Sequence, residues 1–283
     1  MRSLLLYFLL LTSFSAQAYE NIPDHDVLVQ IDSQAPVSEL SSQFTLISWN
    51  IEKAKKQDEW FRDFETLERQ SDIFFLQEGM EDDYLPEVLS TLNGWDWWMA
   101  RAWRNKEGHS TGVMTGGRVK SRKNYFLRSP NNEPIANTPK MALLQIYRLE
   151  TGEPILFVNI HGINFVLNSI FRKQIDQILG VMDPLFEKNP DLKVVFGGDF
   201  NTWNGGRTRY VVTELEKRGF VQVAFQLDRR NLKLDHIFVK GCEISKAHLF
   251  SDIKTSDHAP IQVDIDCDKT TGVHHSVPRF QRM

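Results

Sequence analysis

The sequence predicts an α/β fold in which helices cover β-sheets. Short apolar runs rich in β-branched and aromatic residues recur along its 283 residues, and such runs are typical of strands. Between them lie segments whose apolar residues recur at helical spacing. The helices interrupt the strands without strictly alternating with them, which favours packed layers of sheet and helix. A hydrophobic content of 41% is enough to fill the core of such a fold.

The first predicted elements form a strand-helix-strand unit. Apolar runs at residues 44–49 and 73–76 predict two strands. Between them, Trp60, Phe64 and Leu67 recur at helical spacing and predict a helix over residues 57–69. Residues 95–100 then alternate as a strand does, and this pattern favours tryptophans in the core over a base-stacking platform.

The remaining elements follow the same two patterns. Strands are expected at residues 141–149, 155–160, 194–196, 221–225, 236–239 and 261–265. Helices are expected at residues 86–92, 167–187 and 208–217.

The N-terminus has the features of a secretory signal. Arg2 supplies a positive charge, residues 4–11 form a short apolar run, and Ala16 and Ala18 supply the small residues of a cleavage site. An uncleaved anchor is the alternative, but a spanning helix needs roughly 20 apolar residues. We therefore expect a signal peptide over residues 1–18, a leader over 19–42, the functional domain over 43–268 and a flexible tail over 269–283. The mature chain would be periplasmic or secreted, with no integral membrane association.

The charge balance gives no global argument for a polyanionic partner. The chain carries 33 Lys and Arg against 37 Asp and Glu, which gives a net charge of -4. A local basic groove and a bound metal ion can still attract an anion against this background. The composition therefore weakens an interaction with nucleic acid without excluding it.

Polar motifs stand at the ends of five apolar runs, where a strand delivers side chains to a cleft. These motifs are Trp49-Asn50-Ile51-Glu52, Leu76-Gln77-Glu78, Asn159-Ile160-His161-Gly162-Ile163-Asn164, Gly197-Gly198-Asp199-Phe200-Asn201 and Ser256-Asp257-His258-Ala259-Pro260. In composition and order they resemble the endonuclease/exonuclease/phosphatase superfamily, over residues 44–266. The resemblance is closest to bacterial members with His-x-x-Asn-Phe and Gly-Asp-Phe-Asn-Thr-Trp motifs. It implies a four-layer α/β sandwich of two packed, mainly antiparallel sheets flanked by helices.

The resemblance also implies a divalent metal site. Carboxylate and amide oxygens are the hard ligands that Mg²⁺ prefers, with Mn²⁺ or Ca²⁺ as alternatives. Glu78 is the expected principal ligand, Asn50 lies beside it, and Asp257 completes or supports the site. A helix-capping carboxylate at Glu78 and a turn residue at Asn50 are the structural alternatives.

Four further residues are expected to act on the phosphate and the attacking water. In the family, the residue matching Asp199 orients or deprotonates the water and the one matching Asn201 holds a phosphate oxygen. A purely structural Asx-turn is the alternative. Asp235 is expected to orient His258, which would act as general base or stabilise charge on the phosphate. The choice between His258 and Asp199 as general base stays open.

His161 matches the position of an active-site histidine and is expected to donate to the leaving oxygen or the phosphate, with a structural strand-end histidine as the alternative. Asn164, Lys140 and Arg230 are candidate phosphate contacts. Arg207 and Arg209 could extend a basic rim with Arg230, although a solvated charge run explains them equally well. We expect His236 to be a packed or surface residue, because it should face away from its neighbour Asp235.

The two cysteines provide a test of the topology. The strands that follow Asp235 and His258 both leave the expected site and run similar distances to Cys242 and Cys267. A disulfide at the distal end is therefore the natural expectation in an oxidising compartment. Two unpaired buried thiols are the alternative.

These observations predict an exported metal-dependent phosphodiesterase, with a nuclease acting on nucleic acid favoured. A sphingomyelinase-like hydrolase acting on a lipid, or another phosphoesterase acting on a small molecule, is the first alternative. A lipid enzyme should carry an exposed hydrophobic membrane-contact segment. The second alternative, a non-catalytic binding module, should show decay of the catalytic set, which the sequence retains. The sequence implies no protein partner.

Overall fold

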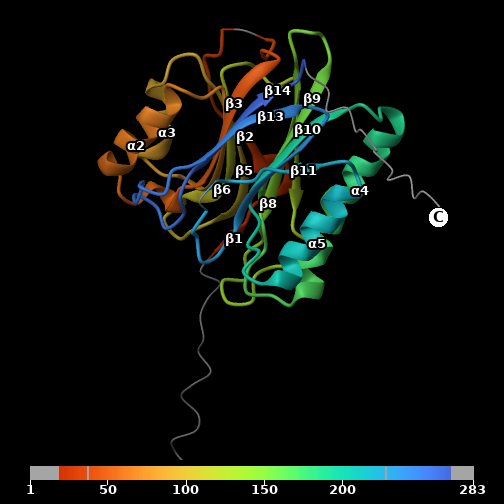
Figure 1. Ribbon diagram of the computed structural model, residues 1–283. Coiled ribbons are helices and arrows are strands. Elements are labelled where there is room, and N and C mark those ends of the chain that lie inside the picture. The colour runs from red at the N-terminus through yellow and green to blue at the C-terminus, as the bar shows by residue number, and fades with distance from the viewer. Residues whose placement is uncertain (1–18, 37, 227, 269–283) are drawn as a thin grey trace, which may run out of the picture.

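A computed structural model describes residues 19–36, 38–226 and 228–268 of the chain. The expected signal peptide and flexible tail lie outside these residues. Two sheets of eight and six strands form the framework (Figure 1). The eight-stranded sheet consists of β1 (Glu20–Asn21), β2 (Leu28–Ser33), β3 (Gln43–Asn50), β4 (Ile73–Glu81), β5 (Asp96–Arg104), β6 (Ser110–Gly117), β13 (Glu243–Leu249) and β14 (Ile261–Asp266). The six-stranded sheet consists of β7 (Lys123–Arg128), β8 (Met141–Arg148), β9 (Pro154–His161), β10 (Lys193–Asp199), β11 (Val221–Gln222) and β12 (Asp235–Lys240).

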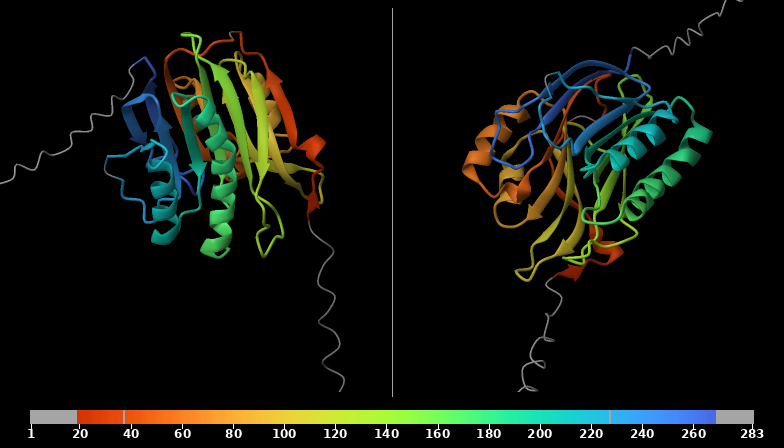
Figure 2. Two further views of the ribbon diagram at one scale, coloured as in Figure 1. Left: turned by 90° about the vertical axis from the view of Figure 1, so that its right-hand side faces the viewer. Right: turned by 60° about the horizontal axis from the view of Figure 1, so that its bottom comes forward.

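Helices cover the outer face of each sheet, which completes four layers (Figures 1 and 2). On the eight-stranded sheet, α2 (Asp58–Glu68) and α3 (Leu85–Thr91) pack through an aromatic cluster that includes Trp60, Phe74 and Trp97. On the six-stranded sheet, α4 (Asn168–Lys188) and α5 (Gly205–Glu216) pack against strand residues such as Val194 and Phe196. The expected four-layer α/β sandwich is confirmed. A one-turn helix, α1 (Asp24–Val27), and a short turn, η1 (Glu52–Ala54), complete the described elements.

The two sheets face each other across an apolar core. Phe44 and Phe75 from one sheet contact Phe157 from the other in edge-to-face geometry. Asn159 of β9 makes polar links across this core. It accepts from Gln77 Nε2 of β4 at 2.8 Å and donates from Nδ2 to the carbonyl oxygen of Met114 in β6 at 2.7 Å. The β3–β4 and β9–β10 pairs are parallel, and the other named strand pairs are antiparallel. Trp97 of β5 and Trp95 just before it are fully buried core residues, whereas Trp98 and Trp103 of β5 are partly exposed.

The segment expected to be a leader contributes to the sheet. β1 and β2 both pair with β5. Ile22 and Val27 are buried in one cluster with Ala100 and Ala102 of β5. Sequence periodicity did not predict these strands, because each is short, has no buried residue and gains its order from hydrogen bonds to a longer partner. The sandwich therefore begins well before residue 43.

Cys242 and Cys267 form a disulfide, as the topology predicted. Cys242 lies between β12 and β13, and Cys267 directly follows β14, so the bridge lies at the ends of β12 and β14 opposite to Asp235 and Ile261. Among the helices of the described residues, none is long and apolar enough to cross a membrane.

Candidate active site

Strand register brings three predicted site residues to one level of the six-stranded sheet. Asp199, the last residue of β10, pairs with His161 of β9 on one side and with Asp235 of β12 on the other. Backbone contact is close here, because a Cβ on Gly198 would lie 2.1 Å from the carbonyl oxygen of Ile160. Glycine at this position, with φ of 134°, therefore permits the approach of β9 to β10.

His258 and Asp235 form the predicted dyad. His258 Nδ1 lies 3.0 Å from both carboxylate oxygens of Asp235. Burial opposes protonation of the ring, but Asp235 outweighs burial and raises the pKa of His258 to about 10. The other ring nitrogen, Nε2, faces Asp199 at 3.9 Å.

Arg230 lies behind this dyad. Its guanidinium contacts Asp228 at 3.0 Å and Asp235 at 3.4 Å. The structure therefore uses this predicted phosphate contact to hold Asp235 in place, and its charge is shared with two carboxylates.

Asp199 occupies the centre of the site and is almost fully buried. Its carboxylate accepts hydrogen bonds from Asn50 Nδ2 at 3.1 Å and from the backbone N–H of Asn201 at 2.8 Å. Burial and the nearby Asp235 raise the pKa of Asp199 to about 7. A carboxylate with this pKa is suited to exchange a proton with water near neutral pH.

His161 lies 3.5 Å from Asp199, measured from Nε2 to Oδ2. Burial and the charge of Lys140 lower the pKa of His161 well below its usual range, so the imidazole is neutral. Beside it, Asn201 donates from Nδ2 to the carbonyl oxygen of Gly162 at 2.8 Å. The two loops that follow β9 and β10 are thereby joined.

The second sheet supplies the predicted metal ligands. The parallel β3–β4 register sets Asn50 opposite Gln77, next to Glu78. A bulge in β4, with Glu78 at φ of 55°, turns the Glu78 side chain toward the site. Burial disfavours its charged form, but the ammonium of Lys53, which also donates a hydrogen bond to it, and that of Lys140 favour the carboxylate and lower its pKa. Glu78 is therefore ionised and able to bind a cation.

Asp257 reaches the same end of the sheet through the turn before β14. Ser256 anchors this turn by donating from Oγ to the carbonyl oxygen of Asn50 at 2.6 Å. The Asp257 side chain is exposed. Asp199, Asp235 and His258 form a second possible group of metal ligands, in which each offers an atom within 4.8 Å of the others.

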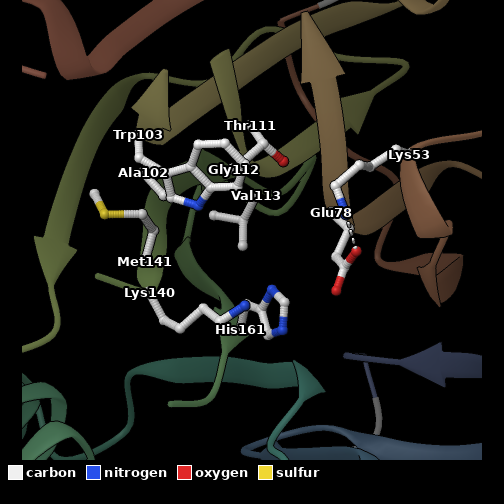
Figure 3. A pocket seen from close by; sticks show the side chains of 10 residues that line it. All are labelled: Lys53, Glu78, Ala102, Trp103, Thr111, Gly112, Val113, Lys140, Met141 and His161. Carbon is white, nitrogen blue, oxygen red and sulfur yellow. Dashed lines mark hydrogen bonds and ion pairs between the residues drawn. The ribbon is translucent and has the colours of Figure 1, made fainter. Parts of the chain in front are cut away.

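A small pocket opens between Glu78 and His161 (Figure 3). Its cavity volume is about 40 Å³, and Trp103 forms one wall. Lys140 points into it and lies 3.6 Å from Glu133, whose carboxylate also accepts the backbone N–H of Asn164. The predicted phosphate contacts Lys140 and Asn164 are thus joined through one glutamate.

Two functional positions differ from what the sequence indicated. Lys53 Nζ contacts Glu78 Oε2 at 2.8 Å, although no motif identified this lysine. Arg207 was a candidate for an exposed basic rim, but it is fully buried and donates to the carbonyl oxygens of Ile163, Val166 and Asn201. Its role is to fix the loops that carry Asn164 and Asn201, whereas Arg209 is exposed. Sequence patterns could not predict this role, because no acidic residue next to Arg207 in the sequence indicates that it is buried.

Comparison with known proteins identifies relatives of this architecture. The profile of the Endonuclease/Exonuclease/phosphatase family matches residues 47–258. A UPF0294 protein of Vibrio cholerae is 31% identical over 236 residues, which cover 81% of this chain and 80% of that protein.

Solved structures share the fold at low sequence identity. An endonuclease/exonuclease/phosphatase family protein from Bacteroides thetaiotaomicron has a TM-score of 0.60 at 16% identity, covering 79% of this chain and 97% of its own. A mannosyl-6-phosphatase from the same organism has a TM-score of 0.57 at 15% identity, covering 78% of this chain and 99% of its own.

Proposed function

Because this chain belongs to the endonuclease/exonuclease/phosphatase family, we propose that it is an exported, divalent-metal-dependent phosphodiesterase that hydrolyses nucleic acid. Members of the family are generally phosphoesterases. The observation that supports catalysis here is the convergence of His161, Asp199 and the His258–Asp235 dyad at one end of the sandwich. A binding module that had lost its activity would have no reason to retain this arrangement of proton-transfer groups.

The donor set fits a hard divalent cation. Asn50 and Glu78 offer an amide and an ionised carboxylate, and the ammonium of Lys53 already acts as a counter-cation on Glu78. Asp257 would complete the ligand set from the turn before β14. When bound, Mg²⁺ or a similar ion would supply charge neutralisation for the phosphate.

The chain's own residues divide the remaining work. Asp199 lies between His161 and His258 and would orient the attacking water and accept its proton. The protonated His258, held by Asp235, would stabilise negative charge on the phosphate. Neutral His161 would donate a hydrogen bond to the phosphate or the leaving oxygen, and Asn201 would position a phosphate oxygen.

Exposed aromatic rings beside the catalytic loops support nucleic acid as the substrate. Trp203 and Phe165 are 43% and 66% exposed, and they follow Asn201 and Asn164 by two residues and one residue. Arg207 stacks on Trp203 at 4.8 Å and fixes the loop that carries Phe165. Such rings can stack on bases, with a typical contribution of about 1–3 kcal/mol per base.

A lipid phosphoester is the second candidate, because two aliphatic side chains near the same loops are also exposed. Leu167 is 73% and Ile135 is 85% exposed. Glu133, two residues before Ile135, accepts the backbone N–H of Asn164, so the two loops are adjacent. Aliphatic side chains in these positions could enter the headgroup region of a bilayer.

Hydrolysis assays with purified mature protein distinguish these substrates. We expect Mg²⁺-dependent cleavage of plasmid DNA or single-stranded oligonucleotides, inhibited by EDTA. Asp199→Asn and His161→Gln should each reduce kcat at least 100-fold, on the order expected for general acid–base groups. His248→Gln is the control, since this histidine is exposed on β13. Cleavage of sphingomyelin or mannose 6-phosphate alone would replace nucleic acid by a lipid or a sugar phosphate, and no cleavage of any would contradict the proposal.

The dyad provides an independent kinetic test. Because Asp235 acts through His258, Asp235→Asn, His258→Gln and the double variant should lose similar activity, each on the order of 100-fold or more. Single-turnover rates at saturating substrate measure this. Losses that multiply in the double variant would show that the two residues act separately.

We propose export on two grounds. The first 18 residues have the pattern of a signal peptide, and the Cys242–Cys267 disulfide suits an oxidising compartment. Fractionation of a producing cell with an antibody to the domain would test this, and a cytosolic full-length product would contradict it.

A further inference from the structure

Lys53 forms an ion pair with Glu78, the residue that is expected to bind the metal ion. Its ammonium lies 2.8 Å from Glu78 Oε2, and both side chains are about three-quarters buried. Figure 3 shows the two side chains pointing toward each other at the mouth of the pocket. Glu78 is the expected principal metal ligand. The Lys53 ammonium therefore occupies the carboxylate to which the metal ion is expected to bind.

The backbone that carries Lys53 is unusual. Glu52, Lys53 and Ala54 have φ of 48°, 61° and 50°. These values lie in the left-handed region of backbone conformation, which residues other than glycine rarely adopt. This turn, η1, is tied to β4 because the N–H of Ile51 donates to the carbonyl oxygen of Gln77 at 3.0 Å. The backbone therefore holds Lys53 over Glu78, whereas Lys55 points to Glu52 instead, at 2.6 Å. Strain of this kind persists where the surrounding structure enforces it and is common at functional sites.

Charge in the pocket of Figure 3 is balanced without a metal ion. Lys53 pairs with Glu78 inside the pocket. Lys140 pairs with Glu133, which lies beside the pocket lining. His161 adds no charge because burial keeps it neutral. A divalent cation on Glu78 would add positive charge next to the Lys53 ammonium, which would then lose its partner.

We propose that Lys53 is a built-in counter-ion of the metal-free site and that metal binding at Glu78 releases it to bind an anionic group of the substrate in this pocket. The proposal rests on the proposed function for the presence of the metal. Lys53 would thus couple the binding of metal to the binding of an anion. The metal ion would break the ion pair between Lys53 and Glu78, and the released ammonium would then bind the anion. The ligand class is a phosphate or another compact oxyanion, bound between Lys53, Lys140 and the wall formed by Trp103.

Metal affinity gives the first test. Titration calorimetry with Mg²⁺ in the absence of phosphate should show about tenfold tighter binding to Lys53→Met than to the wild-type chain, since the competing cation is gone. Lys55→Met is the matched control, because Lys55 belongs to the same turn and contacts Glu52 rather than Glu78. With Mg²⁺ bound, inorganic phosphate should bind Lys53→Met several-fold more weakly than the wild-type chain. Unchanged Mg²⁺ and phosphate affinities in Lys53→Met, or no Mg²⁺ binding by the wild-type chain, would overturn the proposal.

Release of the ammonium can be observed directly in the wild-type protein. Amine acetylation followed by peptide mass spectrometry should modify Lys53 faster in the presence of Mg²⁺ than in EDTA. The more exposed Lys55 should react at the same rate in both conditions. Equal Lys53 rates in both conditions would contradict displacement even if the affinities differ. A chain that shows metal-coupled release but cleaves no phosphoester would refute the proposed function and leave the coupling intact.

Discussion

At the scale of single residues, His236 shows how the interior of the site fixes one protonation state. Thr202 Oγ1 donates to the carbonyl oxygen of Lys233 at 2.8 Å, so it accepts from His236 Nε2 at 2.7 Å. His236 Nδ1 then accepts from Gln222 Nε2 at 3.0 Å. Burial lowers the pKa of His236 to about 4, and the ring packs between Phe200 and Phe238. This confirms the expectation of a packed histidine.

The pH dependence of stability follows from this arrangement. The ordinary pKa of 6.5 applies to the unfolded chain, and the folded value is about 4, so protonation favours unfolding. The stability contributed by neutral His236 is complete above the unfolded pKa and is lost as pH falls toward 4. The free energy of unfolding, measured by urea denaturation, should fall between about pH 7.5 and about pH 4.5. This fall should be smaller in His236→Gln than in the wild-type protein by about 2 kcal/mol. Equal losses in both proteins would show that this histidine titrates normally.

Sequence motifs located most of the residues that converge at the candidate site, and the reason is geometric. Asn50, His161, Asp199 and Asp235 lie at strand termini, and strand termini can be recognised from apolar runs. Lys53 could not be found in this way, because its position depends on a left-handed turn that its own residue types disfavour.

At the scale of elements, the junction of β9 and β10 determines whether His161 and Asp199 can meet. Gly198→Ala would place a methyl group 2.1 Å from the carbonyl oxygen of Ile160 and force a residue with φ of 134° to carry a side chain. We expect a loss of about 3 kcal/mol or more in the free energy of unfolding, since backbone cannot give way as a side chain can. Gly205→Ala is the control, because nothing lies within 4 Å of the added methyl at the start of α5. Urea denaturation of both variants measures the difference, and similar midpoints would contradict this account of the junction.

Sequence analysis missed strands of two kinds. β6 is fully buried, but its serine, threonine and glycine residues give no continuous apolar run. The missed edge strands differ from it. β7 and β13 are partly exposed edge strands, and neither has a fully buried face. Such strands take their order from pairing with a neighbour, which no local pattern records. The buried strands β3, β9 and β10 were predicted within one to three residues at each end, because burial on both faces produces continuous apolar runs.

At the scale of the whole molecule, the disulfide stabilises the sheet edges distal to the site. The two cysteines are 25 residues apart in the sequence. Closing a loop of this size lowers the entropy of the unfolded chain and thereby raises the free energy of unfolding by about 3 kcal/mol. The paired variant Cys242→Ser/Cys267→Ser should therefore unfold at a lower temperature, and a reductant should have the same effect on the wild-type protein. Calorimetry measures both, and an unchanged Tm after verified reduction would contradict a stabilising role.

The covalent ring closed by Cys242 and Cys267 also changes what a protease can do to this molecule. His258 lies inside the ring, and the turn before it exposes Ser251, Asp252 and Lys254 to solvent. A single cut in that turn would leave both fragments joined through the sulfur atoms, with β14 still paired to β3 and β13 still paired to β14. The nicked molecule would keep His258 next to Asp235, so the disulfide would preserve the site after a single cut in this turn.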